Sequence, residues 1–136
     1  MATDKSDELD QGRLEKFEAI TGAVLNAAFE VANTLGCGFF EKVYERALVI
    51  ELQSRGLRAS AQVPMAVMYK GQNVGDYFAD VLVEDIVAIE LKCVERLGNE
   101  HMAQCMNYLT ASGLDVCLLI NFQHSRLEWK RILSRI

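Results

Sequence analysis

Three charged residues near the middle of the chain, Asp80, Glu90 and Lys92, have types and a spacing that could hold a divalent cation. They lie within two segments, residues 76–83 and 87–93, whose odd-numbered positions are apolar. An apolar residue at every second position predicts half-buried β-strands, so we expect an antiparallel hairpin. Both apolar sets can share one face only if the connecting loop has an odd number of residues, and that register places Asp80 opposite Glu90.

The two carboxylates would be the principal ligands of this cation. Cross-strand neighbours have Cβ atoms about 4.5–5.5 Å apart, so Asp80 and Glu90 could share one ion such as Mg²⁺ or Mn²⁺. The carbonyl oxygen of Leu91, which lies between Glu90 and Lys92, is a third candidate ligand. A cation held in this way activates water and relieves charge at phosphorus, while Lys92 would orient the water or stabilise the developing negative charge. The pattern therefore fits phosphodiester hydrolysis.

An ordinary solvated strand face is the alternative explanation of these charges. Apolar neighbours weigh against it, because Phe78 and Leu82 flank Asp80 and Ala88 lies beside Glu90. The sequence contains no Ser/His/Asp set, Gly-rich phosphate loop or zinc-ligand spacing that indicates another class of reaction.

Two flanking segments connect the hairpin with a known family. Residues 38–44, GFFEKVY, match the signature GxxExxY, and residues 104–108, QCMNY, match the QxxxY element of RecB-like nucleases. Together with the hairpin and the apolar segment 118–122, they make the chain resemble the GxxExxY family of small PD-(D/E)XK-type proteins, from about Leu14 to the C-terminus. The resemblance implies an α/β (α+β) fold of the restriction-endonuclease-like type, with an α-β-β-β-α-β core and an antiparallel catalytic hairpin.

The same resemblance adds side chains from two helices to the site. It implies that Glu41 supplies a further carboxylate to the metal and that Gln104 and Tyr108 position phosphate or the attacking water, with His101 and Tyr44 as supporting residues. The residues alone also allow simpler roles. Glu41 could be a first-turn acid that suits the helix dipole, Gln104 and Tyr108 a pair at a helix edge, and Tyr44 a packing residue.

Hydrophobic periodicity predicts the elements that would carry these residues. We expect the order α-α-β-β-β-α-β-β, with helices at residues 14–35 and 39–54, strands at 57–69, 73–83 and 87–92, a helix at 100–112, and strands at 116–122 and 127–133. The first helix and the last strand are additions to the family core. The second helix is expected to bury Phe40 with Tyr44, and it carries Glu45 and Glu51 as rival carboxylate donors. Asn99 is the expected N-cap of the third helix.

The composition is that of an ordinary globular chain with an acidic start. Its 136 residues are 51% apolar and 24% charged, which predicts a single domain, residues 13–136, with a real hydrophobic core. Residues 1–12 contain four acids and one lysine before Arg13, a balance of −3, and we expect a disordered acidic tail. The 4 cysteines are scattered, which favours reduced thiols over disulfides or zinc.

The expected function is a divalent-metal-dependent nuclease, with Mg²⁺ or Mn²⁺ as cofactor and nucleic acid as partner, DNA being favoured over RNA. The alternative is a non-catalytic module of the same fold that binds nucleic acid or a protein. A net charge of −5 speaks against a wide phosphate-gripping surface, and a symmetric homodimer would offer a duplex two sites. The sequence has no apolar run long enough to span a membrane and no signal peptide, so we expect a cytoplasmic protein without a membrane partner.

Overall fold

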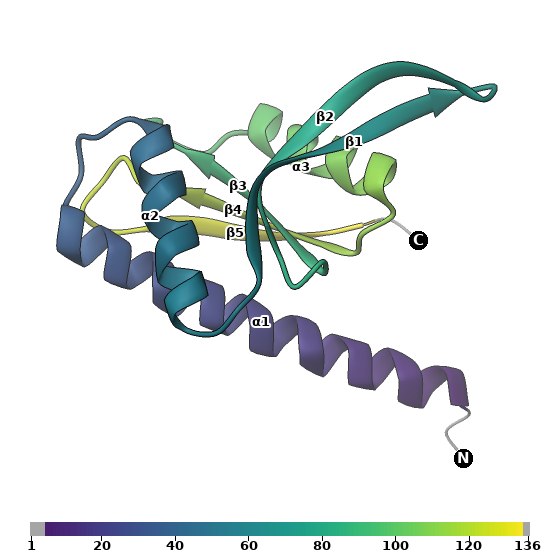
Figure 1. Ribbon diagram of the computed structural model, residues 1–136, viewed down its shortest axis with the longest axis horizontal. Coiled ribbons are helices and arrows are strands. Elements are labelled where there is room, and N and C mark those ends of the chain that lie inside the picture. Colours follow the sequence, from purple (N-terminus) through teal and green to yellow (C-terminus); the bar gives the residue numbers. More distant parts are fainter. Residues whose placement is uncertain (1–4, 135–136) are drawn as a thin grey trace.

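Figure 1 shows the protein, a computed structural model, as one sheet with helices on both of its faces. The structure describes the backbone of residues 5–134 and the side chains of residues 11–134. Its described elements are α1 (Lys5–Leu35), α2 (Glu41–Ser54), β1 (Ala59–Tyr69), β2 (Gln72–Val83), β3 (Val87–Lys92), α3 (Asn99–Ser112), β4 (Val116–Asn121) and β5 (Glu128–Leu133). This order confirms the predicted restriction-endonuclease-like fold, in which α1 and β5 are added to the core.

The sheet has the strand order β1-β2-β3-β4-β5. Strands β1, β2 and β3 form an antiparallel meander, whereas β4 pairs in parallel with β3 because α3 carries the chain back between them. Strand β5 pairs antiparallel with β4. Val83 pairs with Val87, so the loop between β2 and β3 has the odd length that the apolar pattern predicts. Pro64 lies in the edge strand β1, where its missing N–H costs least.

A hydrophobic core lies on each face of the sheet, between the strands and the helices that cover them. Helices α1 and α2 cover one face, and α3 covers the other (Figure 1). The first core contains Val81, Ile89 and Leu91 with the buried stripes of α1 and α2. The second contains Ala88 and the buried side of α3. Strand β3 is therefore buried on both faces, which makes it a rigid support for the residues that it carries.

The odd-numbered residues of β2 change faces within the strand, which corrects the predicted hairpin geometry. Val81 packs in the core under α1 and α2, but Ala79 and Tyr77 belong to the core on the α3 side. The change falls at Asp80 and at its neighbour in β1, Gln62, whose φ of 53° lies in the left-handed region. A period-two pattern assumes regular backbone, and this kink breaks the assumption.

Beyond the kink, β1 and β2 continue as a two-stranded arm, residues 63–79, that projects from the domain (Figure 1). Strand β3 pairs with β2 at Val81, Leu82 and Val83, before the arm begins, so none of the other described strands flanks the arm. Tyr77 and Met65 on one face of the arm pack against the α3 core.

Three predicted details of the helices differ from the structure. Helix α1 begins at Lys5 rather than at Leu14, so it includes most of the segment expected to be a disordered tail. Residues 1–4 of that segment lie outside the described residues. Phe40, expected to be buried, precedes α2 as its N-cap and is 84% exposed. The N-cap of α3 is Gly98 rather than Asn99.

Candidate active site

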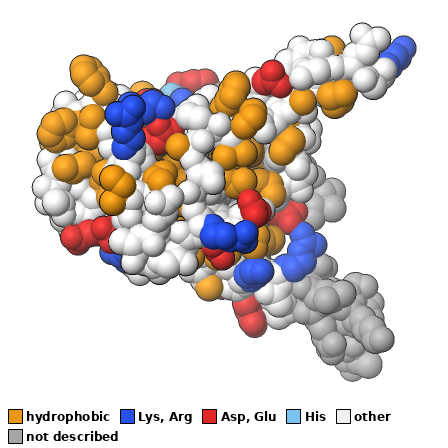
Figure 2. All heavy atoms as spheres, in the orientation of Figure 1, with side chains coloured by type: hydrophobic (Ala, Val, Ile, Leu, Met, Phe, Trp, Pro, Cys, Tyr) orange, Lys and Arg blue, Asp and Glu red, His pale blue; other side chains and the backbone are white. Residues whose placement is uncertain are grey.

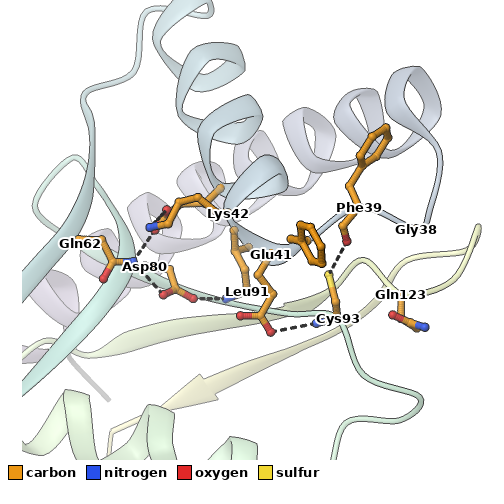
Figure 3. Close-up of a pocket in the computed structure, with 11 residues that line it drawn as sticks. Gly38, Phe39, Glu41, Lys42, Gln62, Asp80, Leu91, Cys93 and Gln123 are labelled. Carbon is orange, nitrogen blue, oxygen red and sulfur yellow. Dashed lines mark hydrogen bonds and ion pairs between the residues drawn. The ribbon is translucent and has the colours of Figure 1, made fainter.

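A pocket of about 660 Å³ opens where β2 leaves β3, beside the N-terminal turns of α2. It is lined by Gly38, Phe39, Phe40, Glu41, Lys42, Glu45, Gln62, Asp80, Leu91, Cys93 and Gln123. Figure 3 shows Asp80, Glu41 and Gln62 close together, on segments from β2, α2 and β1. The pocket thus gathers two of the predicted carboxylates, Asp80 and Glu41, with the proposed carbonyl donor Leu91.

The kink gives Asp80 its position. The carboxylate accepts hydrogen bonds from the Leu91 backbone N–H at 2.7 Å and from the Gln62 side-chain amide at 3.2 Å. Because β2 diverges from β3 here, the Asp80 side chain satisfies a backbone donor of β3 at the point where regular pairing ends. Asp80 is therefore turned toward the space between two strands, rather than standing out from a regular sheet face.

The register of β2 and β3 pairs Val81 with Ile89, so the next position along it sets Glu90 opposite Asp80. This is the neighbour that the sequence predicts for Asp80. Glu90 is 3% exposed, and burial, followed by the nearby charge of Asp80, raises the pKa of its carboxyl from 4.5 to about 9. Lys92 lowers that pKa, but by less. Glu90 does not line the pocket. The two carboxylates are close enough to interact, but one faces solvent and the other is enclosed.

Lys92 and Gln104 form a second part of the arrangement. The Lys92 ammonium donates a hydrogen bond of 2.9 Å to the Gln104 side-chain oxygen, which joins β3 to α3. The sequence predicted that these two residues serve one site, and the structure brings them into contact. Neither lines the pocket that holds Asp80 and Glu41, so the predicted single cleft is divided around β3.

Acidic residues of α2 occupy the far wall of the pocket. Glu41 accepts a hydrogen bond from the Cys93 backbone N–H at 3.2 Å, which points its carboxylate toward β3 (Figure 3). Glu45 is almost fully buried, pairs with Lys42 and accepts a hydrogen bond from Gln62. Of the two rival carboxylate donors on α2, Glu45 is the one that lines the pocket.

The other rival, Glu51, is paired with Arg55 at 2.7 Å and lies outside the pocket lining.

Tyr108 has a buried hydroxyl without a hydrogen-bond partner in the described part of the chain. Burial raises its pKa, and the charge of Glu90 raises it further, so the hydroxyl lies near that carboxyl. An unpaired buried hydroxyl is costly, and a bound water or ligand is one way in which it is satisfied. The geometry is compatible with the predicted supporting role of Tyr108.

The two remaining predicted residues have structural contacts. The Tyr44 hydroxyl donates to the Gly36 carbonyl at 2.6 Å, and its ring stacks on Phe122 at 4.7 Å between centroids. His101 Nδ1 accepts the Gly98 N–H at 2.9 Å, which closes the first turn of α3. Tyr44 holds the loop before α2, and His101 holds the start of the helix that carries Gln104. Their supporting role in the site stays a prediction.

Sequence reasoning did not single out Gln62, although this residue connects Asp80 with Glu45. A glutamine in a strand carries no motif, and its positive φ has no sequence signal because glycine is the residue expected there. The apolar alternation of β1 passes through Gln62 without interruption, so periodicity could not reveal the kink.

Fold and site together define a class of protein: a mixed α/β domain in which an Asp at a kink within one strand lies beside a Glu-x-Lys strand and a helical Gln. The chain belongs to the PD-(D/E)XK nuclease superfamily, because the family model of that description matches residues 18–132. The narrower GxxExxY assignment stays a prediction. No protein of curated function matches the chain in sequence.

Solved structures share this fold at low sequence identity. The crystal structure of SSO0001 matches with a TM-score of 0.56 and 17% identity, over 70% of this chain and 50% of that one. The alkaline exonuclease LHK-Exo from Laribacter hongkongensis, solved in complex with dAMP, matches with a TM-score of 0.50 and 14% identity, over 79% and 76% of the two chains. The chain thus spans half the length of SSO0001, and at these identities the likeness concerns the fold alone.

Proposed function

We propose that the protein is a divalent-metal-dependent nuclease that hydrolyses phosphodiester bonds. The observation that carries the proposal is the position of Asp80 beside the enclosed Glu90, at the point where β2 leaves β3. A carboxyl whose pKa is raised by burial and by a second carboxylate is typical of functional sites, where a cation can relieve the repulsion. Membership of a nuclease superfamily supports the same conclusion.

The donor set fits a hard cation such as Mg²⁺ or Mn²⁺. Within the described residues, no three His, Cys, Asp or Glu side chains come together as a metal site. The protein ligands that we propose are the Asp80 and Glu90 carboxylates with the Leu91 carbonyl. Glu41 would contribute directly or through water. Mg²⁺ ordinarily keeps several waters and binds few carboxylates, which suits this sparse set. A bound cation would supply an activated water and charge relief at the phosphate.

The remaining residues would position and stabilise the reacting groups. Lys92 would place its ammonium where negative charge develops, and Gln104 would fix the direction of that ammonium through their 2.9 Å hydrogen bond. Tyr108 would donate its unpaired hydroxyl to the attacking water or to phosphate. Gln104 would approach the phosphate from the α3 side, opposite Glu41.

The partner is nucleic acid, and we propose DNA rather than RNA. The dAMP bound by LHK-Exo, a distant structural neighbour, agrees with this choice. No helix within residues 5–134 has the length and apolar character that crossing a membrane requires. A homodimer and a cytoplasmic location stay predictions.

Replacement of Lys92 tests the proposal. We expect Lys92→Ala to reduce Mg²⁺- or Mn²⁺-dependent cleavage by about two to three orders of magnitude, because the ammonium acts mainly on the transition state. Folding should survive, and Lys130→Ala on the exposed edge strand is the matched control. The assay compares metal with chelator on single- and double-stranded DNA and RNA.

Two results would count against the assignment. Chelator-resistant cleavage that is equal in wild type and Lys92→Ala would mean that another activity is being measured. Absence of cleavage on every substrate, with a loss of stability in the variant, would favour a non-catalytic binding module instead.

A further inference from the structure

The ring of Phe40 has no evident role in folding. It is 84% exposed, and it occupies the N-cap position of α2, where Ser, Thr, Asp or Asn would stabilise a helix best. It nevertheless lines the same pocket as Asp80 and Glu41. An exposed aromatic ring beside candidate catalytic carboxylates is placed to contact a substrate rather than the core.

The loop that carries Phe40 is fixed. The Phe39 backbone N–H donates to the Tyr44 hydroxyl at 3.3 Å, and the Phe39 ring makes an edge contact with Tyr44 at 6.2 Å between centroids. The Phe39 carbonyl also accepts from the Cys93 thiol at 3.7 Å. Phe40 is thus held on a rigid segment, so a contact made by its ring costs little ordering on binding.

A second exposed aromatic ring, Phe78, lies on the arm near the pocket. Within the arm, Tyr77 packs toward α3, so even-numbered side chains such as Phe78 point to the opposite side, on which α2 lies. Phe78 is 49% exposed there, whereas the exposed Met68 lies beyond a register shift and lines a groove with Tyr77 on the α3 side. Phe78 is two residues from Asp80, so its ring lies next to the site. Figure 2 shows apolar side chains along the projecting arm, with a basic group at its end.

The charges near the site are poorly suited to gripping a phosphate backbone. The pocket contains the acids Glu41, Glu45 and Asp80, and its basic residue Lys42 is already paired with Glu45. The whole chain carries a net charge of −5. Phosphate contacts supply much of the affinity of duplex-binding proteins, so the affinity of this protein for nucleic acid needs another source. Stacking of bases on aromatic side chains is such a source, and it requires bases that are not enclosed in a duplex.

We propose that Phe40 and the exposed ring of Phe78 on the arm bind unpaired nucleobases, so that the substrate is a single strand passing from the arm into the pocket. The inference rests on the proposed function and specifies its substrate. Phe40 stacks the base next to the phosphate at Asp80, and Phe78 stacks a base on the arm side. The shared chemistry is an unpaired base, present in single-stranded DNA and RNA alike.

Binding of labelled oligonucleotides tests the inference without relying on cleavage. Fluorescence anisotropy is measured on the full chain in chelator, with single-stranded DNA, the duplex of the same sequence and single-stranded RNA. We expect the single strand to bind at least about tenfold more tightly than the duplex, and Phe40→Ala to weaken that binding by about tenfold. Phe40→Trp should retain it. Ile50→Ala, which removes a 68% exposed side chain elsewhere on α2, is the matched control.

Phe78→Ala provides a second, independent variant and should weaken single-strand binding in the same direction. Circular dichroism checks that each variant is folded. Because Phe40 and Phe78 are both exposed, we expect their replacement to leave the fold intact. Equal affinity for duplex and single strand, or unchanged binding in both Phe variants, would overturn the inference. A variant that converts a dimer into a monomer without changing single-strand affinity would identify this surface as a contact between copies and would overturn it as well.

The result separates this inference from the proposed function. Metal-dependent cleavage of duplex that does not respond to Phe40→Ala would retain the nuclease and reject the stacking surface. Single-strand binding that depends on Phe40, without cleavage of any substrate, would retain the surface and reject the nuclease.

Discussion

Asp80 and Glu90 occupy neighbouring positions of one hairpin, yet their surroundings are opposite. Asp80 is half-buried in the pocket and accepts hydrogen bonds from the Leu91 N–H and the Gln62 amide. Glu90 is enclosed on the α3 side, and burial raises the pKa of its carboxyl to about 9. The site therefore combines an Asp80 carboxylate that accepts two hydrogen bonds with a Glu90 carboxyl whose raised pKa favours the protonated form at neutral pH until a cation replaces the proton.

The largest expected effect concerns the pH dependence of stability without metal. Glu90 ionises near 4.5 in the unfolded chain and near 9 in the folded one, so between these values the folded state binds the extra proton. Stability must then fall as pH rises, by up to about 1.4 kcal/mol per pH unit for one proton. Urea unfolding in chelator at pH 6, 7 and 8 measures this slope.

Glu90→Gln is the matching variant, since its amide is neutral at every pH. The variant should lose the slope between pH 6 and 8, while Glu100→Gln at the exposed start of α3 should keep it. A wild type whose free energy of unfolding is flat over this range would show that Glu90 is not enclosed as described, and the contrast with Asp80 would disappear.

Metal binding should oppose this loss of stability. A cation that binds only the folded state at a hundred times its dissociation constant stabilises by about 2.7 kcal/mol. The rise in melting temperature with Mg²⁺ or Mn²⁺ should be larger at pH 8 than at pH 6, because binding must remove the Glu90 proton. Asp80→Asn should weaken the response, whereas Asp76→Asn in the arm should leave it intact. Equal metal responses in wild type and Asp80→Asn would place the ion elsewhere.

The same contrast shows which parts of the site could be predicted from the sequence. The Lys92 and Gln104 contact was predictable, because both residues belong to motifs carried by regular elements whose order follows from periodicity. The neighbouring positions of Asp80 and Glu90 were predictable for a similar reason, since the loop length fixes the register.

What could not be predicted depends on backbone conformation and on packing between distant segments. The kink rests on a positive φ at Gln62, a residue type that gives no such signal. The enclosure of Glu90 depends on α3, which crosses over β3 only in the folded chain. Phe40 was assigned to a buried stripe by helical periodicity, but α2 begins one residue later, so that periodicity does not apply to it.

A smaller effect is expected at Gln62, which orients the solvent-facing carboxylate. Gln62→Ala removes the amide that donates to both Asp80 and Glu45, so we expect a loss of about 1 kcal/mol in stability. Cleavage should fall by about tenfold, because a misplaced ligand loses the productive geometry. Gln53→Ala, which removes a hydrogen bond to the Ala59 carbonyl, is the control with a similar stability cost. An equal loss of activity in both variants would reduce Gln62 to a structural residue.

The smallest expected change in stability is at Tyr108, on the enclosed side of the site. Its hydroxyl is buried without a partner among residues 11–134, so Tyr108→Phe removes an unsatisfied group and should leave stability unchanged or raise it by up to about 1 kcal/mol. Tyr44→Phe is the matched control, since it loses the 2.6 Å bond to Gly36 and should lower stability by about 1 kcal/mol. Urea unfolding compares the two, and metal-dependent cleavage adds a second measurement. Tyr108→Phe should cleave more slowly despite its intact fold, because the hydroxyl is kept for substrate or water. A variant that is less stable, or as active as wild type, would mean that the hydroxyl serves the fold rather than the reaction.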